Sequence, residues 1–135
     1  MSLSADIKTK LAADTSLMAT MTGGAHDAVE ISRQLTPTAF DTNNEIKPCI
    51  LVKTGQENAV HNKISAVQTT LSIYFYQRSG FASIDTALAR VLVLLNLYHT
   101  LNIWEIEFNN EIARTTDEAL ACSLAVQRYN VIRKR

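Results

Sequence analysis

Three glutamates are the densest group of chemistry-bearing side chains in this sequence. Glu105, Glu107 and Glu111 stand at positions i, i+2 and i+6 of an alternating segment, so a regular strand would carry all three on one face. Paired carboxylates can perform general acid–base catalysis or hold a cation. The solvated face of an amphipathic strand explains the same spacing more simply, and we therefore predict no catalytic residues here.

The histidines do not form a metal site in the sequence. His26, His61 and His99 lie 35 or more positions apart, and none has another histidine or a cysteine at ligand spacing. The chain also contains no glycine-rich phosphate loop, GxSxG motif or HExxH motif. We therefore expect no metal, no cofactor and no enzymatic activity.

An aromatic run beside a cation raises the possibility of a nucleic-acid platform. Tyr74, Phe75 and Tyr76 stand close to Arg78, and single-stranded nucleic acids stack on such side chains. The alternation assigns Phe75 to a core face, however, and the tyrosines can pack across strands. The 13 basic residues balance the 13 acidic ones, so no overall field attracts nucleic acid, and we expect no specific binding.

The chain should fold as one domain over residues 1–135, because this length supports a single core. The hydrophobic pattern lacks a run of 18 apolar residues, which predicts no membrane partner. The start MSLSADIKTK lacks the features of a signal peptide, so we expect a cytoplasmic protein. Cys49 and Cys122, each among apolar residues, should be small buried hydrophobes.

The first half of the chain predicts a helix, a long loop and two strands. Ser4 would cap the helix, Asp14-Thr15-Ser16 would interrupt it, and Gly23-Gly24 would end it. Residues 22–47 read as a loop with a short strand at Ala28–Ser32, and we expect them, like residues 55–63, to be mobile in a free subunit. Strands at Pro48–Thr54 and Ile64–Arg78 should pair as an antiparallel hairpin.

The second half predicts a helix followed by two strands. Residues 82–97 form the helix, capped by Ser79 or Ser83. Its inner stripe repeats at helical spacing: Ile84, Leu88, Val91, Leu92 and Leu95. Strands over residues 102–112 and 119–132 follow, with a turn at residues 113–118.

These elements give an α+β fold in the order α-β-β-α-β-β. We expect one mostly antiparallel, mixed sheet with helices packed on one face. In the strand over residues 64–78, Leu71 and Phe75 belong to the helix-covered face, whereas Ser72 and Tyr74 belong to a face left polar.

Several segments of the chain match, in order and hydrophobic pattern, the tail-terminator (tail-completion) proteins of long-tailed bacteriophages and prophages. The matching segments are LAADTSLMATMTGG, PCILVKT, YQRSGF, the helix IDTALARVLVLLN and the closing TTDEALACSLAVQRYNVI. The chain resembles this family over most of its length. It departs from the pattern at Glu118, where a glycine often follows the aspartate.

The resemblance implies a structural virion protein. Such a subunit forms a homo-oligomeric ring, commonly a hexamer, that caps the tail tube and docks to the head connector. The implied partners are other copies, the tail-tube protein and the head-connector protein, and the implied location is the host-cell cytoplasm and then the virion. Another neck or connector ring protein would have the same physical profile, and a small ligand-binding α+β domain is the third alternative.

Charge is segregated in a way that suggests how neighbours in a ring could meet. Arg128, Arg133, Lys134 and Arg135 form a basic end with no acid after Glu118. We predict a subunit interface in which Arg128 and Arg133 of one copy face Glu105, Glu107 and Glu111 of the next. The alternatives are contact with a phosphate backbone and a frayed terminus.

Overall fold

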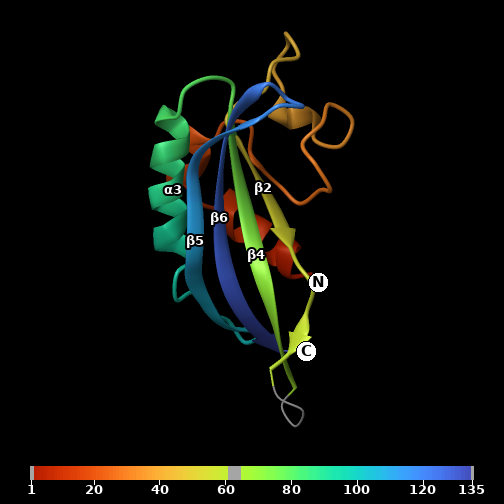
Figure 1. Ribbon diagram of the computed structural model, residues 1–135, viewed down its shortest axis with the longest axis vertical. Helices are drawn as coiled ribbons and strands as arrows, with labels where there is room; N and C mark the ends of the chain where they lie inside the picture. The colour runs from red at the N-terminus through yellow and green to blue at the C-terminus, as the bar shows by residue number, and fades with distance from the viewer. Residues whose placement is uncertain (1, 61–64, 135) are drawn as a thin grey trace.

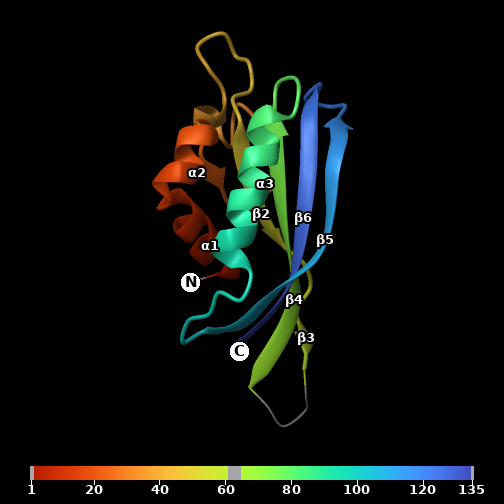
Figure 2. The ribbon, with the colours of Figure 1, turned by 90° about the vertical axis from the view of Figure 1, so that its left-hand side faces the viewer.

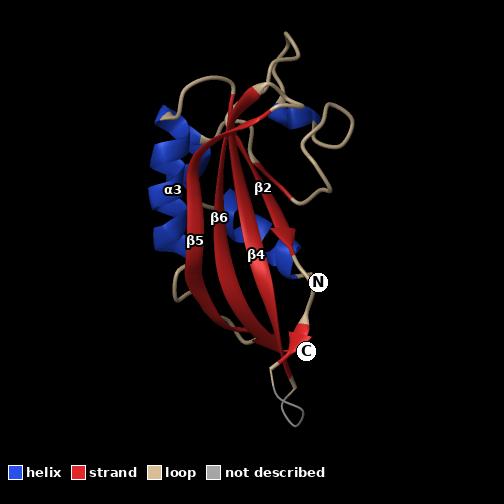
Figure 3. Cartoon of the chain, viewed as in Figure 1, coloured by secondary structure: helices blue, strands red, loops and turns tan. Residues whose placement is uncertain are grey.

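The computed structural model describes residues 2–60 and 65–134 (Figure 1). In these residues a six-stranded sheet is covered on one face by α-helices (Figures 2 and 3). The elements are α1 (Leu3–Ala12), α2 (Thr15–Thr20), β1 (Ala25–His26), the 3-10 helix η1 (Pro37–Ala39), β2 (Cys49–Thr54), β3 (Asn58–Ala59), β4 (Ala66–Gln77), α3 (Ala82–Leu95), β5 (Ile103–Asp117) and β6 (Cys122–Lys134). The predicted α+β class is confirmed, and the two-residue strands β1 and β3 add to the predicted order.

The sheet is mixed, with strand order β1-β2-β4-β6-β5 and β3 paired to β4. Among the described strands, only β1 runs parallel to its neighbour, and the predicted β2–β4 hairpin is antiparallel. β5 forms one edge of the sheet. At the other edge β1 pairs only with Ile50 and Leu51, so β1 leaves the end of β2, from Val52 to Thr54, uncovered.

Local hydrogen bonds explain where the helices begin. The Ser2 hydroxyl, rather than the predicted Ser4, accepts a bond from the Ala5 N–H at 3.2 Å. Asp14 caps α2 by accepting from the Leu17 N–H at 2.9 Å, which confirms the predicted break in the first helix. The prediction for α3 was wrong, because the Gln77 side chain on β4, and neither Ser79 nor Ser83, accepts the first free N–H groups of that helix.

The main core lies between α1, α2 and α3 and the covered face of the sheet. Leu71, Ile73 and Phe75 of β4 are fully buried there, as the alternation predicts. The buried residues of α3 are Ile84, Ala87, Leu88, Val91 and Leu95. The prediction that Leu92 belongs to this core was wrong, because the residue is 36% exposed.

A second, smaller core covers part of the opposite face. Two predictions were therefore wrong: the short strand at residues 28–32 and an opposite face that is polar throughout. Ile31, Ala39 and Ile46 of the 28–47 segment pack against the sheet residues Leu51 and Tyr76. That segment contains no strand at residues 28–32 and is a packed cover rather than a free loop. The opposite face is therefore polar only along the rest of its length, where Ser72 and Asn130 are partly exposed. We call this uncovered part the open face.

The two cysteines lie in or beside this second core. Cys49 and Cys122 are buried free thiols, as predicted from their apolar neighbours. Burial raises the pKa of the Cys49 thiol to about 12 and that of Cys122 to about 11. Both side chains therefore remain neutral at physiological pH and pack as small hydrophobes.

The adjacent glycines 23 and 24 serve two different purposes after α2. Gly24 has a φ of 84°, a conformation that other residues rarely adopt. A Cβ on Gly23 would lie 2.8 Å from the Cys49 Cβ and 2.9 Å from the Pro48 carbonyl oxygen. The chain therefore turns at Gly24, and Gly23 allows the turn to approach β2 closely.

β5 is longer than predicted and irregular. Residues 113–117, predicted as a turn, continue the strand, and the turn to β6 lies at residues 118–121. The pairing with β6 shifts between Ile103 and Glu105, between Phe108 and Asn110, and between Ile112 and Thr115. Because a bulge adds an unpaired residue, each shift changes which side chains point to which face.

Candidate functional site

The three predicted glutamates do not share one face of the sheet. Glu105 and Glu107 pair with Ile132 and Asn130 and lie on the open face. Beyond the irregularity at residues 108–110, Glu111 pairs with Gln127, whose side chain lies on the helix-covered face. The prediction of a single acidic face was therefore wrong for Glu111, because alternation counted along the sequence does not include the bulge.

Glu105 and Glu107 form a close pair of acids at the β5 edge. A hydrogen bond to Glu107, together with the charge of that residue, raises the pKa of Glu105. Two carboxylates at this spacing repel each other when both are ionised. A cation beside them would relieve this repulsion.

Glu111 instead belongs to a hydrogen-bonded group that fastens α3 to the sheet. The Gln127 side-chain N–H₂ donates to the Leu88 carbonyl oxygen of α3 at 2.9 Å and to the Glu111 carboxylate at 2.8 Å. The buried Tyr129 hydroxyl donates to the Gln127 carbonyl oxygen at 2.8 Å. This arrangement provides partners for the polar atoms of a Gln127 side chain that is 1% exposed.

The two predicted arginines also lie on opposite faces. Arg128 is opposite Ser72 and Asn110 on the open face, whereas Arg133 is opposite Val67 and Ile103. Arg133 forms an ion pair with Glu57 of its own chain. Of the five charged residues of the predicted contact between copies, Glu105, Glu107 and Arg128 share the open face, whereas Glu111 and Arg133 lie on the other face.

Sequence analysis missed an apolar surface where α3 meets the edge strand. Six apolar residues of these two elements and the segment between them are exposed. We call them the α3–β5 surface: Ala89, Leu92, Val93, Leu97, Trp104 and Phe108. The Leu97 N–H donates to the Ile106 carbonyl oxygen at 2.8 Å, and the Asn96 side chain accepts from the Phe108 N–H at 3.1 Å. These bonds hold the end of α3 against β5.

The missed signal was a second stripe on α3. Ala89, Leu92 and Val93 stand at i, i+3 and i+4, and Asp85 on the same side of the helix pairs with Arg114 of β5 at 2.7 Å. Figure 1 shows α3 and β5 along the same side of the molecule. Exposed apolar side chains that gather on adjoining elements are typical of an interaction site.

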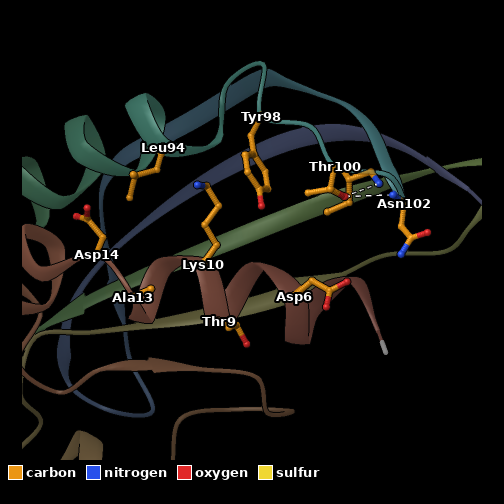
Figure 4. A pocket seen from close by; sticks show the side chains of 10 residues that line it. Asp6, Thr9, Lys10, Ala13, Asp14, Leu94, Tyr98, Thr100 and Asn102 are labelled. Carbon is orange, nitrogen blue, oxygen red and sulfur yellow. Dashed lines mark hydrogen bonds between the residues drawn. The ribbon is translucent and has the colours of Figure 1, made fainter.

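A groove of about 670 Å³ lies between α1 and the segment that joins α3 to β5 (Figure 4). Lys10 enters it from α1, with its ammonium 3.9 Å from the centre of the Tyr98 ring. Asp14 lies at one end and forms a bidentate ion pair with Arg90 at 2.6 and 2.9 Å. The described lining residues contain no histidine, cysteine or serine that could act as a nucleophile with an adjacent base.

The ion pair at the groove predicts an acid-sensitive contribution to stability. The hydrogen bond from Arg90 lowers the pKa of Asp14 from 3.8 to about 2. Because the pKa is lower in the folded state, the ionised carboxylate stabilises the fold above pH 4, and this contribution is lost as the pH falls towards 2. Thermal unfolding followed by circular dichroism should show Asp14→Asn to be less stable at pH 7 and nearly equal to the wild type at pH 2.

Arg90→Gln should reproduce the pH dependence of Asp14→Asn, and the double variant should add little to either change. A wild-type advantage that persists unchanged from pH 7 to pH 2 would contradict the role of the ion pair.

Other candidate chemistry is sparse in residues 2–60 and 65–134. They contain no group of three histidine, cysteine, aspartate or glutamate side chains placed to hold a metal ion. His26 is hydrogen-bonded to the Gly23 carbonyl oxygen at 2.7 Å, and His61 lies outside the described residues. Within that same part of the chain, no helix is long and apolar enough to cross a bilayer.

The comparisons with known proteins identify a related fold. No protein-family model matches the chain, and no curated protein matches it. Among solved structures, the chain is similar to a protein chain in the virion of a native gene transfer agent (GTA) particle, with a TM-score of 0.68 and 18% sequence identity. The likeness covers 98% of this chain and 95% of that chain, so the two share their whole fold.

Proposed function

We propose that this protein is a structural subunit of a phage-like virion. The observation that carries the proposal is the full-length likeness of its fold to a chain of the GTA virion. The exposed α3–β5 surface supports it, because a subunit of an assembly needs surfaces that only neighbours cover.

Within the virion, the proposed role is that of a tail terminator. Copies of the chain, six in the family that its sequence resembles, form a ring that closes the tail tube and presents a face to the head connector. A ring suits this role because a closed set of identical contacts stops growth, whereas an open set would continue as a filament. Its partners are then other copies of itself, the tube protein and the connector protein.

The two ends of the long sheet fit such a role, because they carry different structures. One end holds the packed 28–47 segment and the β5–β6 turn, and the other holds the hairpin between β3 and β4 (Figure 1). A ring of parallel subunits would therefore have two unlike faces. We assign one face to the tube and the other to the connector.

Tail tubes assembled without a terminator provide the test. Tubes incubated with the purified protein should gain a ring at one end in electron micrographs and should stop growing when more tube protein is added. Tubes without the protein serve as the control and should continue to lengthen. If the tubes grow equally in both samples, the terminator role is wrong, and a ring on connectors instead would indicate the alternative neck role.

A further inference from the structure

We infer that the two edges of the sheet are the complementary halves of a contact between copies of this chain. In this contact, the α3–β5 surface and the Glu105–Glu107 pair of one copy meet Lys53 and a hollow beside Val29 on the next copy. This inference rests on the proposed function, because it names how the subunits of the proposed assembly meet. It replaces the predicted contact through Arg128 and Arg133.

The first half of the contact is the β5 edge. Leu97 is 68% exposed and Val93 is 72% exposed, and both flank an edge strand whose Phe108 is 39% exposed. Leu97 also has a φ of 65°, an unfavourable conformation for a leucine, and the bond from its N–H to the Ile106 carbonyl oxygen holds the segment after α3 against β5. Covering these side chains would stabilise an assembly by removing apolar area from water.

The β5 edge is not arranged for simple strand addition. The Ile103 and Ile106 carbonyl oxygens and the Phe108 N–H already bond to residues 96–100 of the same chain. A second copy therefore cannot pair with these backbone groups as a further strand, and side chains must carry the contact at this level.

The second half lies at the opposite edge of the sheet. A hollow of about 360 Å³ borders the uncovered end of β2, and its lining is Ser4, Asp27, Ala28, Val29, Val52, Lys53 and Thr54. Val29 is 76% exposed there. The apolar side chains of the α3–β5 surface of a second copy can enter this hollow and pack against Val29.

Charge and register favour a second copy as the occupant. Lys53 is exposed and lies opposite Ser72 of β4 in the strand register. Glu107 lies opposite Asn130 of β6, which in turn lies opposite Thr70 of β4. Lys53 and Glu107 therefore lie on the same open face, at opposite edges and two residues apart along β4. Copies placed side by side in the same orientation bring the ammonium of one to the carboxylate pair of the next.

A charge exchange tests this contact in the full-length protein. Lys53→Glu and Glu107→Lys should each weaken self-association at least tenfold, because each places like charges across every contact. Native mass spectrometry should then show mostly the 15.0 kDa monomer. An equal mixture of the two variants should assemble again, because every contact in an alternating arrangement is complementary.

Two further variants separate the contact from changes in folding or total charge. Glu118→Lys makes the same change of charge in the exposed turn between β5 and β6 and should leave assembly unchanged. Val93→Asp should abolish assembly, whereas Leu35→Asp, at an exposed leucine of the 28–47 segment, should not. Circular dichroism checks that each variant remains folded.

The outcomes distinguish this inference from the proposed function. If the wild type forms a ring and the Lys53, Glu107 and Val93 variants form it equally well, the contact is wrong although the ring stands. If the mixture of charge variants stays monomeric, the pairing of Lys53 with Glu107 is wrong. A wild type that is monomeric at every concentration overturns the contact, and the tail-tube experiment then decides the terminator role separately.

Discussion

Leu95→Ala is expected to lower the free energy of unfolding by about 2–5 kcal/mol. Leu95 is fully buried between α3 and the sheet, in the same core as Leu71 and Ile73. Alanine would remove most of that side chain and leave a cavity, because a helix fastened to β5 and β6 cannot move in to fill it. Urea unfolding followed by circular dichroism measures the loss.

Leu92→Ala is the matched control, because it makes the same chemical change three residues earlier on the same helix. Leu92 is 36% exposed, so we expect a loss below about 1 kcal/mol. The measurements should cover a tenfold range of protein concentration, since Leu92 lies on the α3–β5 surface and association would add its own stabilisation. Equal losses for the two variants would show that α3 is rotated relative to the structure.

Gln127→Leu is expected to cost about 1–3 kcal/mol, although leucine is more hydrophobic. The substitution removes the donors to the Leu88 carbonyl oxygen and the Glu111 carboxylate. It also leaves the Tyr129 hydroxyl, which lies on a fully buried side chain, without its acceptor. An unpaired buried hydroxyl loses its bonds to water without gaining others.

The double variant Gln127→Leu with Tyr129→Phe tests this cause. Removing both partners should recover part of the loss, because no orphaned hydroxyl remains. The recovery is read as the interaction energy in a double-mutant cycle of urea unfolding experiments. If the two losses simply add, the hydrogen bond between Tyr129 and Gln127 does not contribute to stability.

Much of the fold could be predicted from the sequence because the relevant signals are local. Alternation along β4 identified Phe75 and Leu71 as core residues, and the helical repeat of α3 identified Val91 and Leu95. Leu92 was misassigned because it lies at the border of the inner stripe, where a repeat of 3.6 residues does not decide between the core and an edge. Whether Leu92 is buried or exposed depends on the position of β5 beside α3.

Two other features that shape the candidate site have no local signal. The bulge beside Phe108 turned Glu111 to the covered face, and an inserted residue of this kind leaves no mark in a pattern of period two. The cover formed by Ile31 and Ile46 depends on contacts with β2 and β4, which are distant in the sequence. Neither could be read from the residues themselves.

The sequence by itself determined the class of fold, the main strands and helices, the buried face of β4 and most of the buried face of α3, because each follows from the spacing of apolar side chains along one element. Only the tertiary structure decided which charged residues lie together. Glu107 and Lys53 belong to elements far apart in the chain, and their common face depends on strand order, register and bulges. Those three properties arise from pairing between strands, and no single segment contains them.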